Sequence, residues 1–440
     1  MTALVRRYVT ANVRSKLLFR KPQLGLFPGD PLGRLDGERL VGWLKATVAR
    51  LDMAKVHALF EDHGGVPYDP SRLLCALILG AFNRRTSSRE LEDACRFDVR
   101  FVAAADFETP DYRTLARFRA RLVPVMDDLF AQVVRMAMED GLVSLGRVSL
   151  DSTKVASAGS QGKEWFRKGL DEDAAQGLCR PYSDPEAPVR KTRKGPLRGY
   201  TVQAAVDTES GIVVSCGVTL EPNDRGQVPE TLERIASATG ALPSALLADK
   251  GYGSNGSHAC LEARGVVGFV PPQDNPSVFW SDLGDGTLRC PMGHPALPMP
   301  VKLQHGVPVV PYRVRKCGGC ILKQACSPKA RGRTVVCAAG LDPLARVRAG
   351  RRALEPEGKA AAKERSGSVE PVFGDMKWNH RLSRLTLRTH LKAKAQILLW
   401  TTAKNLRTMF KRLAAALTAV FATVFGPEKH GEAAAAAARG

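Results

Sequence analysis

The first part of the chain carries apolar residues with the spacing of helices. Pro70 is placed as in the first turn of a helix. The apolar residues that fall on one face of this helix are Leu73, Leu74, Leu77 and Ile78. Ser87 and Glu90 form a capping box, which predicts a second, short helix that ends near Phe97. We therefore expect residues 1–142 to form a helical domain.

A basic helix is predicted next. Thr109 and Pro110 have the residue types of an N-cap and of a first helical position. The inward positions of this helix are Leu115, Phe118 and Leu122, and the arginines on its other face are Arg113, Arg117, Arg119 and Arg121. Short helices followed by a basic one are typical of a helix-turn-helix unit on DNA. A plain helical bundle with solvated arginines has the same pattern, so both interpretations stay open.

From about residue 143 the pattern changes to that of strands joined by helices. The predicted strands are 147–150, 200–206, 211–220, 242–248 and 266–270, and the predicted helices are 229–238 and 257–264. Three strands in succession, followed by helix, strand, helix and strand, are similar to the order of a ribonuclease H-like sheet. In that order the first three strands form an antiparallel meander, and the fourth pairs with the first. We therefore predict an α/β fold with a ribonuclease H-like core.

Two long segments do not fit this pattern. Residues 157–198 are rich in glycine, serine and charge and predict a loop, whose basic run 190–198 we expect to be mobile. Residues 271–350 are rich in proline, glycine and cysteine and predict an insertion, after which helices resume. The predicted division is a helical DNA-binding domain (1–142), a first part of the core (143–270), the insertion (271–350), a second part of the core with a glutamate-bearing helix and C-terminal helices (351–426), and a disordered tail (427–440).

The charge of the chain is strongly positive, with 65 Lys and Arg against 44 Asp and Glu and a net charge of +21. Such an excess favours a polyanionic partner through counterion release, although solvated arginines alone would also raise it. The sequence shows no secretion signal and no apolar run of spanning length, so we expect a cytoplasmic, nucleoid-associated protein without a membrane partner. Ten cysteines in such a chain indicate thiols or metal ligands and not a disulfide framework.

Three acidic residues stand where predicted elements end or begin. Asp151 ends the first apolar strand, Asp249 ends the fourth, and Glu370 lies at the predicted start of a helix. Since the first and fourth strands are neighbours in the predicted sheet, we expect Asp151 beside Asp249. Carboxylate oxygens suit Mg²⁺ or Mn²⁺, and phosphodiester cleavage uses two such ions about 3.5–4 Å apart. We therefore predict two metal ions on these three residues, with Asp151 bridging them.

Three further aspartates are alternatives to these three acidic residues. Asp207 lies in a predicted hairpin turn and Asp224 in a Pro-Asn-Asp-Arg-Gly loop, where turn roles are expected. Asp375 would lie on a different helix face from Glu370.

Lys377 follows Glu370 by seven residues, which is nearly two turns at roughly 100° per residue. We therefore predict that Lys377 contacts a DNA phosphate from the same helix face.

The motifs around these residues resemble those of the DDE transposases of bacterial insertion sequences. Asp-Ser-Thr-Lys at 151–154 and Ala-Asp-Lys-Gly-Tyr at 248–252 are similar to the first and second aspartate motifs of that family, and 365–377 to its glutamate signature. One subgroup has a helical N-terminal domain and a cysteine-containing insertion before the catalytic glutamate. The further segments that are similar to this subgroup are 68–70, 87–91, 109–119 and 402–407.

The glutamate signature departs from the pattern of many relatives, which is Tyr-x₂-Arg-x₃-Glu-x₆-Lys. Glu370 and Lys377 fit this pattern, but Ser366 stands at the arginine position and Ala362 at the tyrosine position. Arg365 is next to the position where the arginine is missing. We therefore predict that Arg365 takes over the contact with phosphate.

The resemblance implies an enzyme of DNA transposition. Water activated by metal on Asp151, Asp249 and Glu370 would cleave at the ends of the element, and the freed 3′-hydroxyl would attack target DNA. Arg113, Arg117 and Arg121 would hold the terminal inverted repeats, and a homodimer on DNA would pair two ends. Two alternatives stay open: a nuclease of the same fold, and a non-catalytic DNA-binding regulator derived from a transposase.

The predicted insertion also holds a group of cysteines. Cys317-Gly-Gly-Cys320 has the spacing of half a tetrahedral zinc site. Cys290 or His294, together with Cys326, would supply the other two ligands. Members of the resembled subgroup often carry such a cluster. A structural Zn²⁺ ion and a set of reduced thiols both stay open as interpretations.

Overall fold

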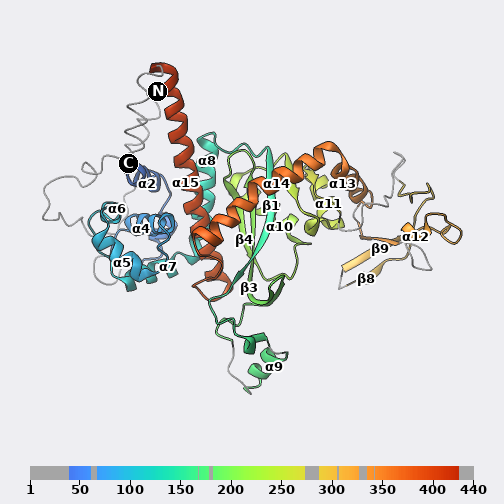
Figure 1. Cartoon of the computed structure of the whole chain (residues 1–440), viewed down its shortest axis with the longest axis horizontal. Coiled ribbons are helices and arrows are strands. Elements are labelled where there is room, and N and C mark those ends of the chain that lie inside the picture. Colours follow the sequence, from blue (N-terminus) through green and yellow to red (C-terminus); the bar gives the residue numbers. More distant parts are fainter. Residues whose placement is uncertain are drawn as a thin grey trace. The chain divides into compact units, whose positions relative to one another are not determined.

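The computed structural model describes residues 39–60, 67–166, 168–177, 182–272, 287–304, 307–326, 334–340 and 342–425 (Figure 1). These residues form two compact units. The helical unit contains the described residues of 1–142, 154–200 and 374–440, and the sheet unit contains those of 143–153 and 201–373. The predicted tail at 427–440 lies outside the described residues.

Helices dominate the helical unit. Those at its N-terminal end are α2 (Arg39–Val48), α3 (Ala54–His57), α4 (Pro70–Phe82), α5 (Ser88–Phe97), α6 (Val99–Ala104), α7 (Tyr112–Arg121), η1 (Val123–Val125) and α8 (Met126–Glu139). The long helix α15 (His390–Phe425) packs against α4 and α8. Among the helices that the structure describes, none combines the length and apolar character needed to cross a membrane.

The local signals for these helices are confirmed with one exception. Asp69 caps α4, whose first residue is Pro70, and Ser87 and Glu90 form the predicted capping box of α5. Helix α7, however, begins at Tyr112 and not at Pro110, because the Asp111 carboxylate accepts a hydrogen bond from the backbone of the helix and acts as its N-cap. The predicted inward residues of α7, Leu115, Phe118 and Leu122, are all buried.

The sheet unit is built on a sheet whose strand order agrees with the prediction. Strands β3 (Gly195–Asp207) and β4 (Val213–Thr219) are antiparallel, and β3 is also next to β1 (Arg147–Ala156). Strand β5 (Ala245–Ala248) pairs parallel with β1, and β6 (Val267–Phe269) pairs parallel with β5. Helix α10 (Gln227–Thr239) packs on β4, and α11 (Asn255–Ala263) leads into β6. The fold is therefore of the mixed α/β class, as predicted.

Strand β1 is longer than the sequence predicts. We expected it to end at Asp151, where polar residues begin, but it continues to Ala156. Its pairing with β5 nevertheless stops at Leu150, because β5 ends at Ala248. Asp151 is therefore not at the end of its strand, and lies at the first position of β1 beyond its parallel neighbour.

The cysteine-containing segment has its own small sheet, which the sequence did not predict. Strand β9 (Val307–Arg313) pairs antiparallel with β7 (Leu297–Pro298), β8 (Lys302–Gln304) and β10 (Thr334–Ala338). A small apolar core around Leu288, Val314 and Val335 lies beneath these strands. The short helix α12 (Lys323–Cys326) belongs to the same segment, and α13 (Ala345–Leu354) and α14 (Pro356–Gly374) follow it.

The basic run at 190–198 is not a mobile loop, contrary to the prediction. Strand β2 (Val189–Thr192) forms a hairpin with the start of β3. Arg190 and Arg198 are both only 3% exposed. The Arg198 guanidinium donates to the Asp171 carboxylate at 2.7 Å and to the Trp165 carbonyl at 2.9 Å. Burial and these contacts fix a segment whose composition alone suggested mobility.

Candidate active site

Alternate residues of β1 fasten helix α14 to the sheet. Because side chains alternate along a strand, positions 147, 149 and 151 share one face of β1. Arg147 donates to the Glu364 carboxylate at 2.9 Å, and its other amino group donates to Glu357 at 3.1 Å. The Ser368 hydroxyl donates to the Ser149 hydroxyl at 2.7 Å. The face of β1 that carries Asp151 is thus held against α14 by independent contacts.

Asp151 has a hydrogen-bond donor on each of its carboxylate oxygens. Oδ1 accepts from the Ser152 backbone N–H and Oδ2 from Nη1 of Arg365, both at 2.7 Å. The Asp151 side chain is only 21% exposed. Burial raises the pKa of Asp151; the Ser152 N–H and the Arg365 charge lower it, and the nearby Asp249 carboxylate raises it further. The protein thus holds this carboxylate in place in surroundings that oppose its charge.

Asp249 stands beside Asp151, as predicted. Leu150 and Ala248 are register partners in adjacent parallel strands, and each is followed by one of the two aspartates. Asp249 ends β5 and caps the short helix η3 (Lys250–Tyr252), since its Oδ1 accepts from the Gly251 N–H at 2.8 Å. A Cβ atom on Gly251 would lie 2.8 Å from that same oxygen, so a side chain at this position would push the Asp249 carboxylate away from its hydrogen bond.

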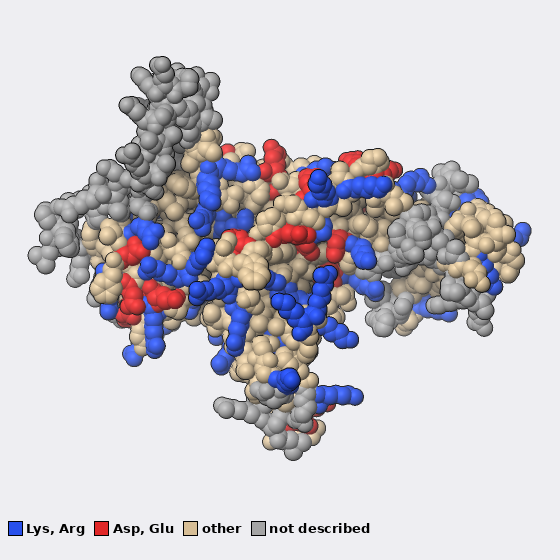
Figure 2. Space-filling model, viewed as in Figure 1, with Lys and Arg blue, Asp and Glu red and all other residues tan. Residues whose placement is uncertain are grey.

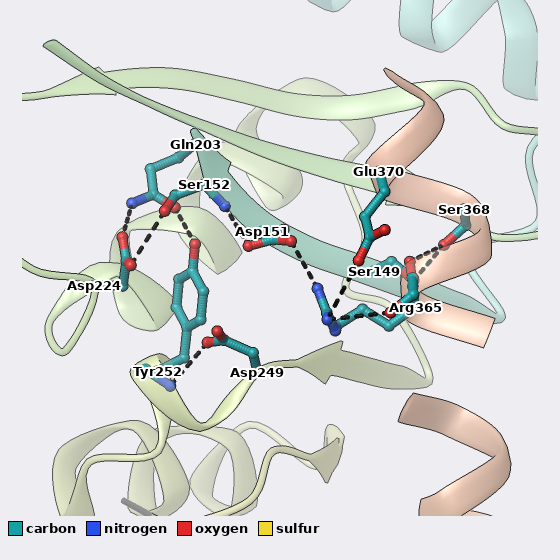
Figure 3. Close-up of polar contacts among 12 residues, drawn as sticks. Ser149, Asp151, Ser152, Gln203, Asp224, Asp249, Tyr252, Arg365, Ser368 and Glu370 are labelled. Atoms are coloured by element: carbon teal, nitrogen blue, oxygen red, sulfur yellow. Dashed lines mark hydrogen bonds and ion pairs between the residues drawn. The ribbon is translucent and has the colours of Figure 1, made fainter. Parts of the chain in front are cut away.

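Glu370 reaches this site from α14. The sequence predicted that Glu370 begins a helix, but α14 already begins at Pro356, because the alanine- and lysine-rich stretch at 359–363 extends it. The Glu370 side chain is 62% exposed, and its Oε1 lies 4.0 Å from Nη2 of Arg365. Figure 3 shows the Arg365 guanidinium between the Asp151 and Glu370 carboxylates. Arg365, predicted to contact phosphate, therefore pairs here with the first aspartate.

A chain of hydrogen-bonded side chains, which we call the polar chain, connects residues of the two aspartate motifs. Asp224 accepts from the Ser152 hydroxyl at 3.1 Å and from the Gln203 amide at 2.6 Å, and the Tyr252 hydroxyl donates to Gln203 (Figure 3). Tyr252 is fully buried, and its burial raises its pKa well above the usual value. The sequence assigned Asp224 to a turn and missed this role. In the sequence, Asp224 was marked only by its position in the loop after a core strand. Such a position does not show what the side chain contacts.

The carboxylates of this site suit a divalent cation in chemistry and charge. They are hard oxygen donors, and a guanidinium lies between two of them as a stand-in cation. Across the described part of the chain, however, no group of three or more His, Cys, Asp and Glu side chains lies close enough to hold a metal ion. Asp151, Asp249 and Glu370 would have to draw together, and the guanidinium would have to move, for a metal ion to be bound.

Lys377 follows α14 in a turn of different helix type. The segment Asp375–Asn379 is π-helical, and Lys377 is half-buried within it. Burial lowers the pKa of Lys377. The predicted shared face with Glu370 assumed an unbroken α-helix, so the spacing argument does not hold beyond Gly374. A phosphate contact by Lys377 stays a prediction.

Three of the four predicted arginines on α7 are exposed. Arg113, Arg117 and Arg121 recur every four residues and so share one face of the helix. Arg119 instead turns inward and donates to the Thr86 carbonyl at 2.7 Å. Figure 2 shows Lys and Arg side chains spread over much of the visible face, with Asp and Glu side chains among them. The exposed face of α7 is thus available to a phosphate backbone.

The four cysteines of the predicted zinc site do not form a metal site among the described residues. Cys290 is buried in the small apolar core of its segment, and the Cys317 thiol lies 3.6 Å from the Val314 carbonyl. Cys320 and Cys326 are half-buried thiols. A zinc ion on Cys290, Cys317, Cys320 and Cys326 stays a prediction.

Two family models match parts of the chain. Residues 289–410 match the family model "Transposase DDE domain", and residues 35–121 match "Transposase domain (DUF772)". The first match contains Glu370 and Lys377, and the second contains the three exposed arginines of α7. No curated protein matches the chain. A solved structure that it resembles is a piggyBac transposase synaptic complex with hairpin DNA, at 13% identity and a TM-score of 0.35, with 88% of this chain and 76% of that chain covered. The two family matches confirm the resemblance to DDE transposases of the insertion-sequence type that the motifs carry.

Proposed function

We propose that this protein is a DDE transposase that cleaves DNA at the ends of an insertion sequence and joins those ends to target DNA. The observation that carries the proposal is the register of β1 and β5, which puts Asp151 and Asp249 side by side, with Glu370 reaching toward them from α14. We also propose that the sheet is a ribonuclease H-like core, because its first strand lies between the antiparallel pair and the two parallel strands.

Divalent metal is part of this proposal. Asp151, Asp249 and Glu370 would hold two Mg²⁺ or Mn²⁺ ions, which supply an activated water and stabilise the leaving oxygen when bound. The residues of the chain prepare this chemistry. The Ser152 N–H orients Asp151, and the Gly251 N–H orients Asp249. The hydrogen bond between Ser149 and Ser368 holds the part of α14 next to Glu370 against β1.

DNA binding is proposed for the helical N-terminal domain, residues 1–142. Arg113, Arg117 and Arg121 lie on one exposed face of α7, where their positive charges can contact phosphates of a DNA backbone. Lys377 would add a phosphate contact near the cleaved end. The proposed partners are the terminal inverted repeats and the target DNA, held by a homodimer at the nucleoid.

The proposal is tested by cleavage and joining in a purified system. The protein is incubated with Mg²⁺ and a plasmid that carries the DNA flanking its gene, beside an Asp151→Asn variant. We expect nicks at discrete ends and joined products from the wild type and neither from the variant. Cleavage without joining would identify a nuclease of the same fold, and DNA binding without cleavage would identify a regulator.

A further inference from the structure

We propose that Arg365 is the resident counter-cation of the acidic site and that a divalent metal ion displaces it from Asp151. This inference rests on the proposed function, because it assumes that Asp151, Asp249 and Glu370 hold the metal. It adds a step to that function: metal entry and movement of Arg365 become one event. The guanidinium that is released would then be free to contact a DNA phosphate.

The contacts of Arg365 are the first reason. Its Nη1 donates to Oδ2 of Asp151 at 2.7 Å, and its Nη2 lies 4.0 Å from Oε1 of Glu370. Both carboxylates are proposed metal ligands. The guanidinium therefore occupies the space between two ligands and not a separate surface site (Figure 3).

The hydrogen bonds of Asp151 make metal and arginine competitors. Each oxygen of Asp151 already accepts one hydrogen bond, Oδ1 from the Ser152 N–H and Oδ2 from Arg365. Of these two donors only the Arg365 guanidinium carries a charge and can move with its side chain, so it is the one that a metal ion on Asp151 would compete with. A metal ion binds a carboxylate oxygen at about 2.0–2.1 Å for Mg²⁺, which would set a divalent charge within a few ångströms of the guanidinium. Repulsion between the two cations in this partly buried site favours release of the arginine.

The burial of this pair explains why a stand-in cation is needed. The Arg365 side chain is 15% exposed and that of Asp151 21%. A partly buried carboxylate without a partner is costly, and a second carboxylate, Asp249, stands next to it. Arg365 offsets this cost in the absence of metal, and a metal ion offsets it equally well or better.

A purely structural role for Arg365 is less consistent with the other contacts. Helix α14 is already fastened to β1 by the Arg147–Glu364 ion pair and by the Ser149–Ser368 hydrogen bond. These contacts precede and follow Arg365 on the helix, so the attachment does not depend on it. The Arg365 side chain can also move toward solvent, because Glu370, which lies on the side of the guanidinium away from Asp151, is 62% exposed.

The test measures metal binding directly, without DNA and without turnover. Free Mn²⁺ is followed by its electron paramagnetic resonance signal during titration into wild-type protein and into the variants Arg365→Gln, Arg365→Lys and Asp151→Asn. Glu364→Gln is the matched control, because it removes a neighbouring ion pair between β1 and α14 and leaves the acids alone. Circular dichroism of each variant checks that the fold is retained.

We expect Arg365→Gln to bind Mn²⁺ about tenfold more tightly than wild type, since it loses a competing charge worth about 1.4 kcal/mol at that ratio. Arg365→Lys keeps the charge and should stay near wild type, as should Glu364→Gln. Binding should fall in Asp151→Asn. The Mn²⁺-induced rise in melting temperature should follow the same order.

Two outcomes would overturn the inference. If wild type binds Mn²⁺ through Asp151 but Arg365→Gln binds it equally or more weakly, Arg365 is a structural or supporting residue and the proposed function stands. If neither protein binds Mn²⁺ in a way that depends on Asp151, both the inference and the proposed metal-dependent function fail.

Discussion

The acidic region and the cysteine region of the sheet unit were both predicted to bind metal, but the fold positions their side chains in different ways. The acidic region is organised by strand register, which sets the backbone positions of Asp151 and Asp249 side by side. The cysteine region was predicted from a Cys-x₂-Cys spacing and from the resemblance to the family. In neither region do three or more His, Cys, Asp and Glu side chains of the described residues lie close enough to hold a metal ion. Strand order predicts that two distant aspartates become neighbours, whereas a short Cys-x₂-Cys spacing does not show where the remaining ligands come from.

The two regions also differ in how their groups are stabilised. Asp151 has donors on both oxygens and a cation beside it, yet burial still raises its pKa. Cys290 simply packs in an apolar core. A group that the fold holds at a cost is more informative about function than a group that fits its surroundings.

The largest effect is expected at Asp249. An Asp249→Asn variant keeps the oxygen that accepts from the Gly251 N–H, and asparagine is as good an N-cap as aspartate. The fold should therefore be unchanged, while Mg²⁺-dependent cleavage should fall on the order of 10³-fold. Plasmid nicking and thermal melting, measured on the same preparation, separate the two. Wild-type activity in this variant would show that the acidic region is not the active site.

A smaller effect on stability is expected at Tyr252. Its hydroxyl donates to the buried Gln203, which in turn donates to Asp224. Tyr252→Phe leaves the Gln203 oxygen without this donor, at a cost of about 1–3 kcal/mol in the free energy of unfolding. Chemical denaturation measures this cost. An unchanged free energy of unfolding would mean that the polar chain behind the aspartates does not hold them.

A carboxylate of the opposite kind lies in the helical unit. Hydrogen bonds from His380, and then from Asn379, lower the pKa of Asp375 to about 2. A lowered pKa means that ionised Asp375 stabilises the fold at neutral pH, and that this stability is lost as the pH falls from about 4 toward 2. Asp375→Asn should therefore be less stable than wild type at pH 7, by about 1 kcal/mol, because the side chain is partly exposed.

Acid unfolding provides the measurement for Asp375. The difference in stability between wild type and Asp375→Asn should narrow below about pH 4 and vanish only below about pH 2. A constant difference over this range would mean that the ionisation of Asp375 contributes nothing. Ionised Asp151 should have the opposite effect on stability, because its raised pKa means that the charged carboxylate destabilises the folded state.

The smallest effect is expected in the cysteine region. Cys320 is a half-buried free thiol, so Cys320→Ser should change the free energy of unfolding by no more than about 0.5 kcal/mol. Thermal melting with and without a zinc chelator checks this. A loss of several kcal/mol, together with a loss of bound zinc in the variant, would show that the thiols gather around a zinc ion after all.

Much of the site was predictable because it follows from strand order. The alternation of strands and helices placed β5 next to β1, and the two aspartates followed from that. The first-turn proline and the apolar face of α4 and the capping box of α5 were also local signals, and the structure confirms them. Asp207 has the turn role that was predicted, since it accepts from the Ser210 N–H at 2.8 Å.

The errors arose where a residue's role depends on distant partners. Strand β1 continues through polar residues because Val155 and Ala156 are buried beyond them. Asp224 and Arg365 were assigned from local sequence, one to a turn and one to DNA. Their contacts are with Ser152 and Asp151, far away in the chain. No local pattern encodes such pairs, so only the folded structure reveals them.

The assignment of Asp151, Asp249 and Glu370 as the catalytic residues is tested by comparing two glutamates on the same helix. Glu370→Gln and Glu357→Gln make the same chemical change on α14, but only Glu370 faces Arg365 and the aspartates, whereas Glu357 pairs with Arg147. The measurement is Mg²⁺-dependent cleavage and joining of DNA that carries the flanking sequence. We predict that Glu370→Gln abolishes both reactions and that Glu357→Gln retains them. Equal activity in the two variants would contradict the assignment of Asp151, Asp249 and Glu370 as the catalytic residues.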